Sequence, residues 1–159
     1  MSKGSFDMAN AMLACNEDLI LQQAQSIIEN RYLRGEQLLS PHAVREYLTF
    51  KLAPLEHEVF AILLLDTQHR VLAYQELFRG TLNSVNVYPR EIVKLSLRYN
   101  AGALILVHNH PSGEPEPSGA DREITRKLKS VLELLDIQVL DHLIVAGTKV
   151  VSLAELGLV

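Results

Sequence analysis

Residues 102–121 read GALILVHNHPSGEPEPSGAD, and the expected fold follows from this segment. Residues 103–107 form an apolar run between a glycine and a proline-rich loop, which is typical of a strand buried on both faces. Side chains alternate in direction along a strand, so His108 and His110 point the same way where this strand ends. The loop cannot continue the strand. We expect it to return the chain to a helix that begins near the same point, at Ser118 and Asp121.

This arrangement predicts a metal site. Two imidazoles and one carboxylate, from His108, His110 and Asp121, are sufficient protein ligands for a catalytic zinc ion with water in its fourth position. Each part also has a structural explanation. A histidine pair at a strand end is often structural or exposed. Ser118-x-x-Asp121 before an amphipathic segment is typical of a capping box, in which both side chains bond free N–H groups at a helix start.

The spacing of these residues resembles the signature of the JAMM (Mov34/MPN) metallopeptidase superfamily, His-x-His-Pro-x6-Ser-x2-Asp, including Pro111. The similarity is greater to the RadC-like JAB domain branch and extends from about Glu17 to the C-terminus. Segments that support this branch are HNHPSG at 108–113, Pro117-Ser118, Gly80-Thr81, Pro89-Arg90-Glu91-Ile92 and Asp141-His142.

The resemblance implies an α/β fold, a three-layer α-β-α sandwich with a mixed sheet related to cytidine deaminases. It also implies one Zn²⁺ per chain, held by His108, His110 and Asp121, and hydrolysis of amide bonds by a metal-activated water. Iron, which two histidines and a carboxylate also suit, ranks second because of the His-x-His order and the JAMM spacing. A nucleoside deaminase is opposed by the absence of its Pro-Cys-x-x-Cys ligands, since Cys15 is the single cysteine.

Such hydrolysis needs a general base that moves a proton from water to the leaving nitrogen. The carboxylates considered for this role are Glu56, Glu58, Glu76, Glu114 and Glu116. Glu58 begins an apolar segment, so the core can fix its position, and the resemblance implies a catalytic glutamate at such a strand start. We therefore assign the role to Glu58, with an exposed strand-end glutamate as the alternative.

Three further polar residues belong to the expected site region. The resemblance implies that Ser118 donates a hydrogen bond to the oxyanion formed on attack, a role that it can combine with helix capping. Asn109 points away from its histidine neighbours if the strand persists, so we expect it to order the loop. We expect His142 to be a core histidine whose ring nitrogens are hydrogen-bonded. The alternatives are that it supports a metal-bound histidine or is a distant fourth imidazole.

The remaining chain predicts the other elements of the sandwich. Residues 1–52 read as a flexible tail plus a short helical extension, with helices at 17–33 and from Ser40-Pro41, and residues 53–159 as the metal-binding domain. Strands are expected at 58–66, 71–77, 137–145 and 150–151. Helices are expected from Pro89 to about 100 and from Ser118 to about 135, with a helical tail from Leu153.

Composition limits the possible partners. The chain has 159 residues, a net charge of −4 and 48% hydrophobic residues, so we expect one ordinary domain with a packed core. The charge gives no support to nucleic-acid binding, which depends on clustered Lys and Arg. No signal peptide or membrane span is recognisable, which predicts a cytoplasmic protein. A peptide or protein is the expected substrate class; its identity and the oligomeric state are left open.

Two other functions remain as alternatives. The first is a scaffold protein with a structural or vestigial metal site, since many MPN domains lose ligands. None of the ligands is missing here, which favours chemistry. The second is a DNA-repair-associated role, which the RadC resemblance suggests and which a helix-hairpin-helix segment would support. We find no glycine-rich hairpin pattern in the first expected helices.

Overall fold

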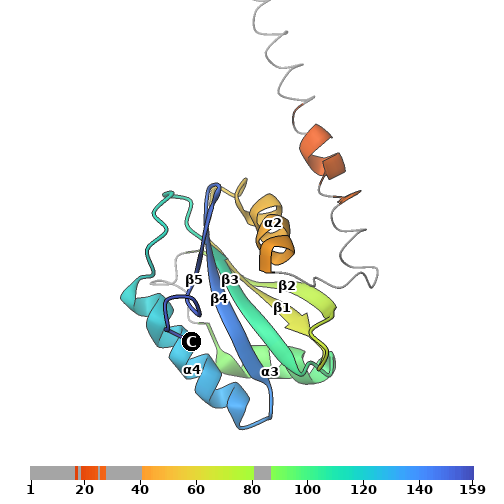
Figure 1. The fold of residues 1–159 in the computed structure, drawn as a ribbon, viewed down its shortest axis with the longest axis vertical. Coiled ribbons are helices and arrows are strands. Elements are labelled where there is room, and N and C mark those ends of the chain that lie inside the picture. The colour runs from red at the N-terminus through yellow and green to blue at the C-terminus, as the bar shows by residue number, and fades with distance from the viewer. Residues whose placement is uncertain (1–16, 18, 25, 28–40, 81–86) are drawn as a thin grey trace, which may run out of the picture.

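The computed structural model describes residues 17, 19–24, 26–27, 41–80 and 87–159 (Figure 1). The element bounds are α2 Pro41–Leu52, β1 Val59–Leu65, β2 Val71–Arg79, α3 Pro89–Arg98, β3 Ala103–Asn109, α4 Gly119–Glu133, β4 Gln138–Ala146 and β5 Lys149–Ser152. The described residues between 17 and 27 are also helical. The order of hairpin, helix, strand, helix and final strands is the predicted one.

The strands form one mixed sheet in the order β2-β1-β3-β4-β5. β1 runs antiparallel to β2 and to β3, β3 and β4 are parallel, and β4 and β5 are antiparallel. A parallel pair needs a long crossover connection, and α4 supplies it between β3 and β4. Every residue of β1 and β3 is buried, as expected for central strands with both faces covered.

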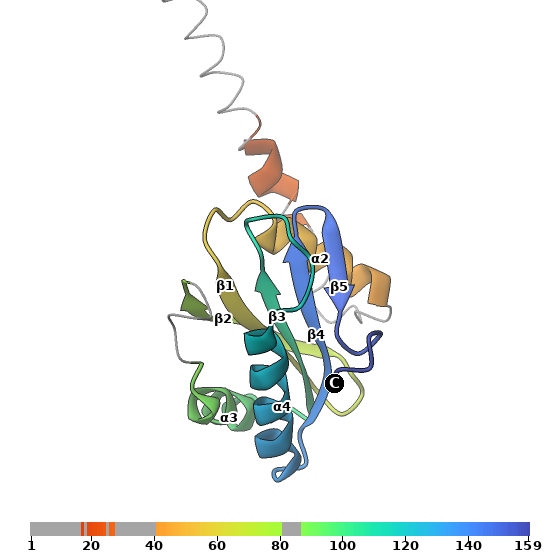
Figure 2. The same cartoon turned by 90° about the vertical axis from the view of Figure 1, so that its left-hand side faces the viewer.

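Helices cover both faces of the sheet (Figure 2). α2 packs on one face, where its buried Tyr47 and Leu48 join β-strand residues such as Val107 in one apolar cluster. α3 and α4 cover the opposite face, where Ile92 and Leu128 join a second cluster. Alternate residues of β1 and β3 enter alternate clusters, so the period of two along each strand supplies both cores. This confirms the predicted three-layer α-β-α sandwich.

Two predicted details are wrong. Leu135, which we expected on the apolar face of the helix that begins at Ser118, is 40% exposed. Leu135 lies beyond the last residue of α4, whose buried residues are Asp121, Thr125, Leu128 and Leu132. Residues 153–157 form turns rather than a helix. The fully buried Leu153 fixes this tail, and Gly157, with φ of +70°, turns the chain.

Several expectations concern the N-terminal region. The expected apolar face of residues 17–33 includes Leu19, Ile20 and Ile27, all of which are more than half exposed. The expected tail at 1–16, the capping Ser40, and the positions 28–40 and 81–86 lie outside the described residues. Among the described helices, none combines the length and the apolar character that a bilayer span requires.

The sheet brings the site residues together at one end. β3 carries the histidines, and its antiparallel register with β1 pairs His108 with Phe60. The two rings are stacked with centroids 6.3 Å apart on the face covered by α3 and α4. The loop after His110 then leads directly to the start of α4. The first turn of this helix therefore lies beside the end of β3.

Candidate metal centre

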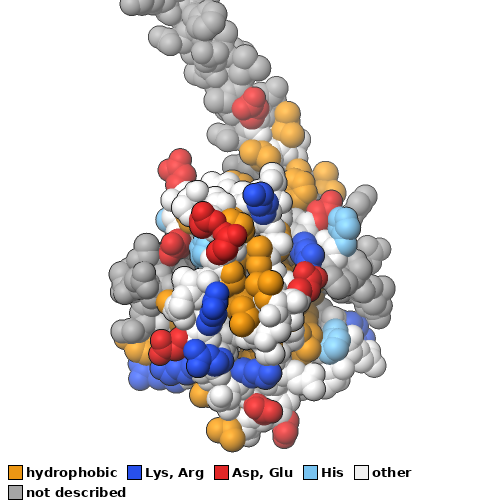
Figure 3. Space-filling view, turned by 60° about the vertical axis from the view of Figure 1, so that its left-hand side comes forward, with side chains coloured by type: hydrophobic (Ala, Val, Ile, Leu, Met, Phe, Trp, Pro, Cys, Tyr) orange, Lys and Arg blue, Asp and Glu red, His pale blue; other side chains and the backbone are white. Residues whose placement is uncertain are grey.

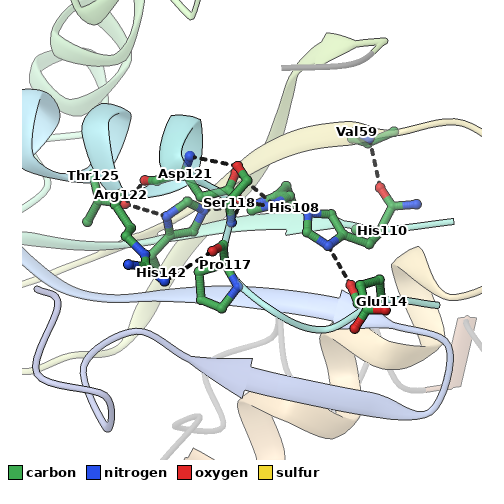
Figure 4. Close-up of polar contacts among 11 residues, drawn as sticks. Val59, His108, His110, Glu114, Pro117, Ser118, Asp121, Arg122, Thr125 and His142 are labelled. Carbon is green, nitrogen blue, oxygen red and sulfur yellow. Dashed lines mark hydrogen bonds and ion pairs between the residues drawn. The ribbon is translucent and has the colours of Figure 1, made fainter. Parts of the chain in front are cut away.

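The structure brings the three predicted ligand side chains to one point (Figure 4). His108 Nε2 lies 2.9 Å from His110 Nε2. It also lies 3.2 Å from Asp121 Oδ1, and His110 Nε2 lies 3.8 Å from Asp121 Oδ2. The side chains of His108 and Asp121 are each 1% exposed, whereas that of His110 is 15% exposed. The three residues can thus hold a metal ion that solvent reaches from the His110 side.

A buried hydrogen-bond chain fixes the orientation of His108. Its Nδ1 lies 2.8 Å from His142 Nε2, and His142 Nδ1 lies 2.6 Å from Thr125 Oγ1. The Thr125 hydroxyl donates to the backbone carbonyl of Asp121, 2.5 Å away. His142 and Thr125 are fully buried. The chain therefore links β3, β4 and α4 without solvent.

The direction of each bond in this chain follows from the single proton on Thr125. Because that proton goes to the Asp121 carbonyl, Thr125 Oγ1 must accept from His142 Nδ1–H. His142 Nε2 then carries a lone pair and accepts from His108 Nδ1–H. Burial, followed by charge repulsion from His108, lowers the pKa of His142 well below its usual value, which agrees with this neutral form. The Nε2 lone pair of His108 is left facing Asp121.

His110 is oriented in the same sense by the loop that follows it. Its Nδ1 lies 2.6 Å from the backbone carbonyl of Glu114, which can only accept, so His110 Nδ1–H is the donor. Its backbone N–H donates to the Val145 carbonyl of β4 at 2.8 Å. His110 Nε2 therefore also presents a lone pair, directed at the Nε2 lone pair of His108.

Asp121 is positioned by the capping box at the start of α4. Its Oδ2 accepts from the Ser118 backbone N–H at 2.7 Å, and the Ser118 side chain accepts from the Asp121 backbone N–H at 3.2 Å. This capping box was expected from the sequence as the structural alternative to a metal site. In the structure the same box also orients the Asp121 carboxylate. Asp121 Oδ1 is buried and receives no hydrogen bond from the described residues.

The electrostatics of Asp121 favour its ionised form. Burial alone would raise the pKa of the carboxyl. Hydrogen bonding and attraction from the His108 ring when that ring is protonated, together with the hydrogen bonds of Ser118, outweigh burial and hold the pKa well below its usual range. An ionised carboxylate is the form that binds a metal ion.

Glu58 and Ser118 lie at the starts of two elements, β1 and α4. Of the glutamates considered as general base, Glu58 is half-buried and the other four are exposed. Glu58 directly precedes β1, and its carbonyl accepts from the Gly80 N–H at 2.9 Å. Ser118 is the N-cap of α4, and its hydroxyl proton is not used in the capping bond.

Thr125 was not predicted to belong to the site. It lies four residues after Asp121, on the same buried side of α4 as Leu128. A polar residue at a buried helical position is the sequence pattern that could have indicated a role for it. His142 is buried with both ring nitrogens hydrogen-bonded, and it is also the partner of the candidate ligand His108. The predicted core histidine and the alternative, a partner of a ligand histidine, therefore describe the same residue.

Comparisons with known proteins identify the family of this chain. The family model of the RadC-like JAB domain matches residues 38–158. A UPF0758 protein of Vibrio cholerae is 54% identical over 141 residues, which cover 89% of each chain. A UPF0758 protein of Methylibium petroleiphilum is 55% identical over 139 residues, which are 87% of this chain but only 63% of that relative. Neither name describes an activity. The chain belongs to the RadC-like JAB domain family.

Proposed function

We propose that this protein is a zinc-dependent hydrolase of amide bonds in peptides or proteins, of the metallopeptidase or isopeptidase type. One observation carries the proposal. The protons of His108 and His110 are both committed to Nδ1, so two Nε2 lone pairs face each other across 2.9 Å beside the orphaned Asp121 Oδ1. Three electron donors without a shared proton repel one another, and a divalent cation between them would reverse that repulsion.

The donor set fits zinc. Two imidazole nitrogens and one carboxylate oxygen leave one position open, as in catalytic zinc sites. Zn–N bonds of about 2.0–2.1 Å in a tetrahedral arrangement place two nitrogens about 3.3 Å apart, close to the present separation. The bond that His108 Nδ1–H donates to His142 and the bond that His110 Nδ1–H donates to the Glu114 carbonyl are the kind of supporting contacts that metal-bound histidines need.

The proposed reaction divides its tasks among this chain's residues. Zinc, when bound, acidifies a water and polarises the carbonyl of the scissile amide. Glu58 takes a proton from the attacking water and delivers it to the nitrogen, so that the C–N bond breaks to give a carboxylate and an amine. The Ser118 hydroxyl donates to the oxygen that gains negative charge, a contact worth roughly 3 kcal/mol in related settings.

A peptide substrate suits the surface better than a nucleic acid. The face shown in Figure 3 intersperses Lys and Arg with Asp and Glu around a group of hydrophobic side chains, rather than presenting a continuous basic surface. The net charge of −4 supports the same choice. We therefore expect the substrate to be recognised by its shape and by hydrophobic contacts rather than by binding of phosphate groups.

Hydrolysis by the zinc-loaded protein tests the proposal. The protein is incubated with a diverse mixture of peptides and of proteins linked through lysine side chains, and new amino groups are identified by mass spectrometry. We expect cleavage by the wild type and none by Glu58→Gln, which retains the shape of the residue and the metal. The matched control is Glu56→Gln, an exposed glutamate two residues earlier, which should cleave normally. Equal cleavage by wild type and Glu58→Gln would refute the assignment of the base.

A further inference from the structure

Asn109 is a buried polar residue that the proposed reaction does not use. It lies between the two candidate ligands in β3 and is 2% exposed. Alternation along β3 directs it to the α2 side, as it directs Val107, whereas His108 faces α4. Its amide therefore cannot serve the metal centre directly. A buried amide on this apolar face needs hydrogen-bond partners of its own.

Those partners are backbone groups immediately before β1. Asn109 Oδ1 accepts from the Val59 N–H at 2.7 Å, the contact drawn at Val59 in Figure 4. Asn109 Nδ2 donates to the His57 carbonyl at 3.0 Å and lies 3.4 Å from the Leu55 carbonyl. One side chain thus bonds a segment about fifty residues earlier in the chain.

These bonds bracket Glu58. The His57 carbonyl belongs to the peptide unit before Glu58, and the Val59 N–H belongs to the peptide unit after it. The Glu58 carbonyl, in that second unit, is bonded to the Gly80 N–H. Both peptide planes next to the Glu58 Cα are therefore held, which restricts the two backbone rotations that set the direction of its side chain.

The restricted direction leads toward the metal centre. The register of β1 with β3 pairs Phe60 with His108, and Phe60 stacks on that ring. Val59 belongs to the cluster on the α2 side. The bond between Gly80 and Glu58 continues the ladder of β1 and β2 by one residue. Alternation then assigns Glu58 to the same face as Phe60 and His108.

We propose that Asn109 is a positioning residue, whose amide fixes the backbone on both sides of Glu58 and so sets the general base against the metal centre. The inference rests on the proposed function, because it assumes that Glu58 is the base. An amide suits this task because it offers an acceptor and a donor in one plane. The strand that carries the ligands thereby also holds the base.

Cobalt-loaded protein provides a test that needs no substrate. Co²⁺ replaces zinc as the probe, and its visible absorption is followed against pH in the wild type, Asn109→Ala, Glu58→Gln and the double variant. Amide hydrogen exchange at Val59 is measured by NMR in the same proteins. Val107→Ala is the matched control, since it removes packing from the same side of β3 and leaves the bonds around Glu58 intact.

We expect Asn109→Ala to accelerate amide hydrogen exchange at Val59 about tenfold, which is the effect expected from the loss of one hydrogen bond. It should also move the pH transition of the cobalt spectrum in the same direction as Glu58→Gln does. The double variant should match Glu58→Gln alone, because Asn109 acts through Glu58. Val107→Ala should leave the transition unchanged. Asn109→Asp keeps an acceptor for Val59 and has no donor for His57, so it should move the transition in the same direction without the tenfold acceleration of Val59 exchange. It replaces Asn109→Ala if that variant does not fold.

Two results would overturn the positioning role alone. In the first, Glu58→Gln moves the transition and the Asn109 variants do not. In the second, an Asn109 substitution still shifts the transition in the Glu58→Gln background, which shows a direct effect on the metal centre. A different result, in which Glu58→Gln itself leaves the transition unmoved, would refute the assignment of the base and the positioning role together.

Discussion

His142 Nε2 accepts a hydrogen bond from His108 Nδ1 at 2.8 Å in a site that solvent does not reach. Through Thr125, the same chain continues to the backbone of Asp121. Two of the three candidate ligands are therefore connected by protein hydrogen bonds as well as by their shared position. Changes in this chain should alter metal affinity without touching any ligand.

Thr125→Val tests that connection. Valine keeps the shape of threonine but leaves His142 Nδ1–H without an acceptor, which should cost about 1–3 kcal/mol of the free energy of unfolding. Loss of such supporting contacts typically weakens metal binding about 10–100-fold. We expect both effects, measured by thermal unfolding and by zinc competition against a chelator.

Ser130→Ala is the matched control for Thr125→Val. Ser130 also lies in α4 and makes the same type of bond, to the carbonyl of Arg126 four residues earlier, but it is exposed. This variant should change zinc affinity less than about twofold and stability by less than about 0.5 kcal/mol. Equal zinc affinities for Thr125→Val and Ser130→Ala would show that the chain through His142 does not support the ligands.

Asp121→Asn should separate metal binding from folding. The Asn oxygen can keep the bond from the Ser118 N–H, while its NH₂ group can donate to the His108 lone pair that Asp121 Oδ1 only repels. We expect the metal-free variant to unfold at or above the wild-type temperature and to gain no stability from zinc. Functional sites commonly trade stability in this way.

Asp121→Ala provides the contrast. It removes the acceptor for the Ser118 backbone N–H, while the backbone N–H at position 121 can still donate to the Ser118 side chain. The lost bond should lower the metal-free stability by about 1 kcal/mol. Thermal unfolding in the presence of a chelator, and again with added zinc, measures both variants. A metal-free Asp121→Asn protein that is as unstable as Asp121→Ala would refute the repulsion inferred at this carboxylate.

The fold and the ligand set were predictable because they depend on local rules. The apolar run before His108 identifies a buried strand, alternation aligns His110 with it, and the capping pattern locates the start of α4 beside Ser118 and Asp121. The contacts of Asn109 and His142 were not predictable, because they depend on strand register. His142 reaches His108 only because β4 lies parallel to β3 with His142 paired to Leu106.

Errors in the predicted helix faces have a different cause. A period of 3.6 residues identifies an apolar side, but it does not state where a helix ends or what lies opposite it. Leu135 falls beyond the end of α4 and is 40% exposed. The point at which the helix ends therefore decided its exposure.

The pH dependence of metal-free stability follows from the low pKa of Asp121. When the His108 ring is protonated, the folded pKa of Asp121 lies below the unfolded value of about 3.9. In that state the ionised carboxylate stabilises the fold, and this contribution is lost as the pH falls through the folded pKa. Each pKa unit of difference corresponds to about 1.4 kcal/mol. Between pH 5 and about 2, we expect the wild type to lose stability relative to Asp121→Asn. Parallel denaturant-unfolding curves for the two proteins over this range would contradict the assignment.

Ser118 has two proposed roles that different substitutions distinguish. Ser118→Ala removes the capping acceptor and the hydroxyl donor, and should cost about 1 kcal/mol of stability. It should also lower the hydrolysis rate about 100-fold. Ser118→Asp keeps a good cap and has no hydroxyl donor, so it should retain stability and lose activity. Full activity of Ser118→Asp would exclude the oxyanion role.

Zinc content of the folded protein is the most decisive measurement. The wild type is dialysed against micromolar zinc and then against metal-free buffer, and zinc per chain is determined by mass spectrometry, with folding checked by circular dichroism. We expect one zinc ion per chain in the wild type, and none in His108→Ala or Asp121→Ala. A folded wild type that retains no zinc, or a His108→Ala protein that retains as much as the wild type, would contradict the metal centre.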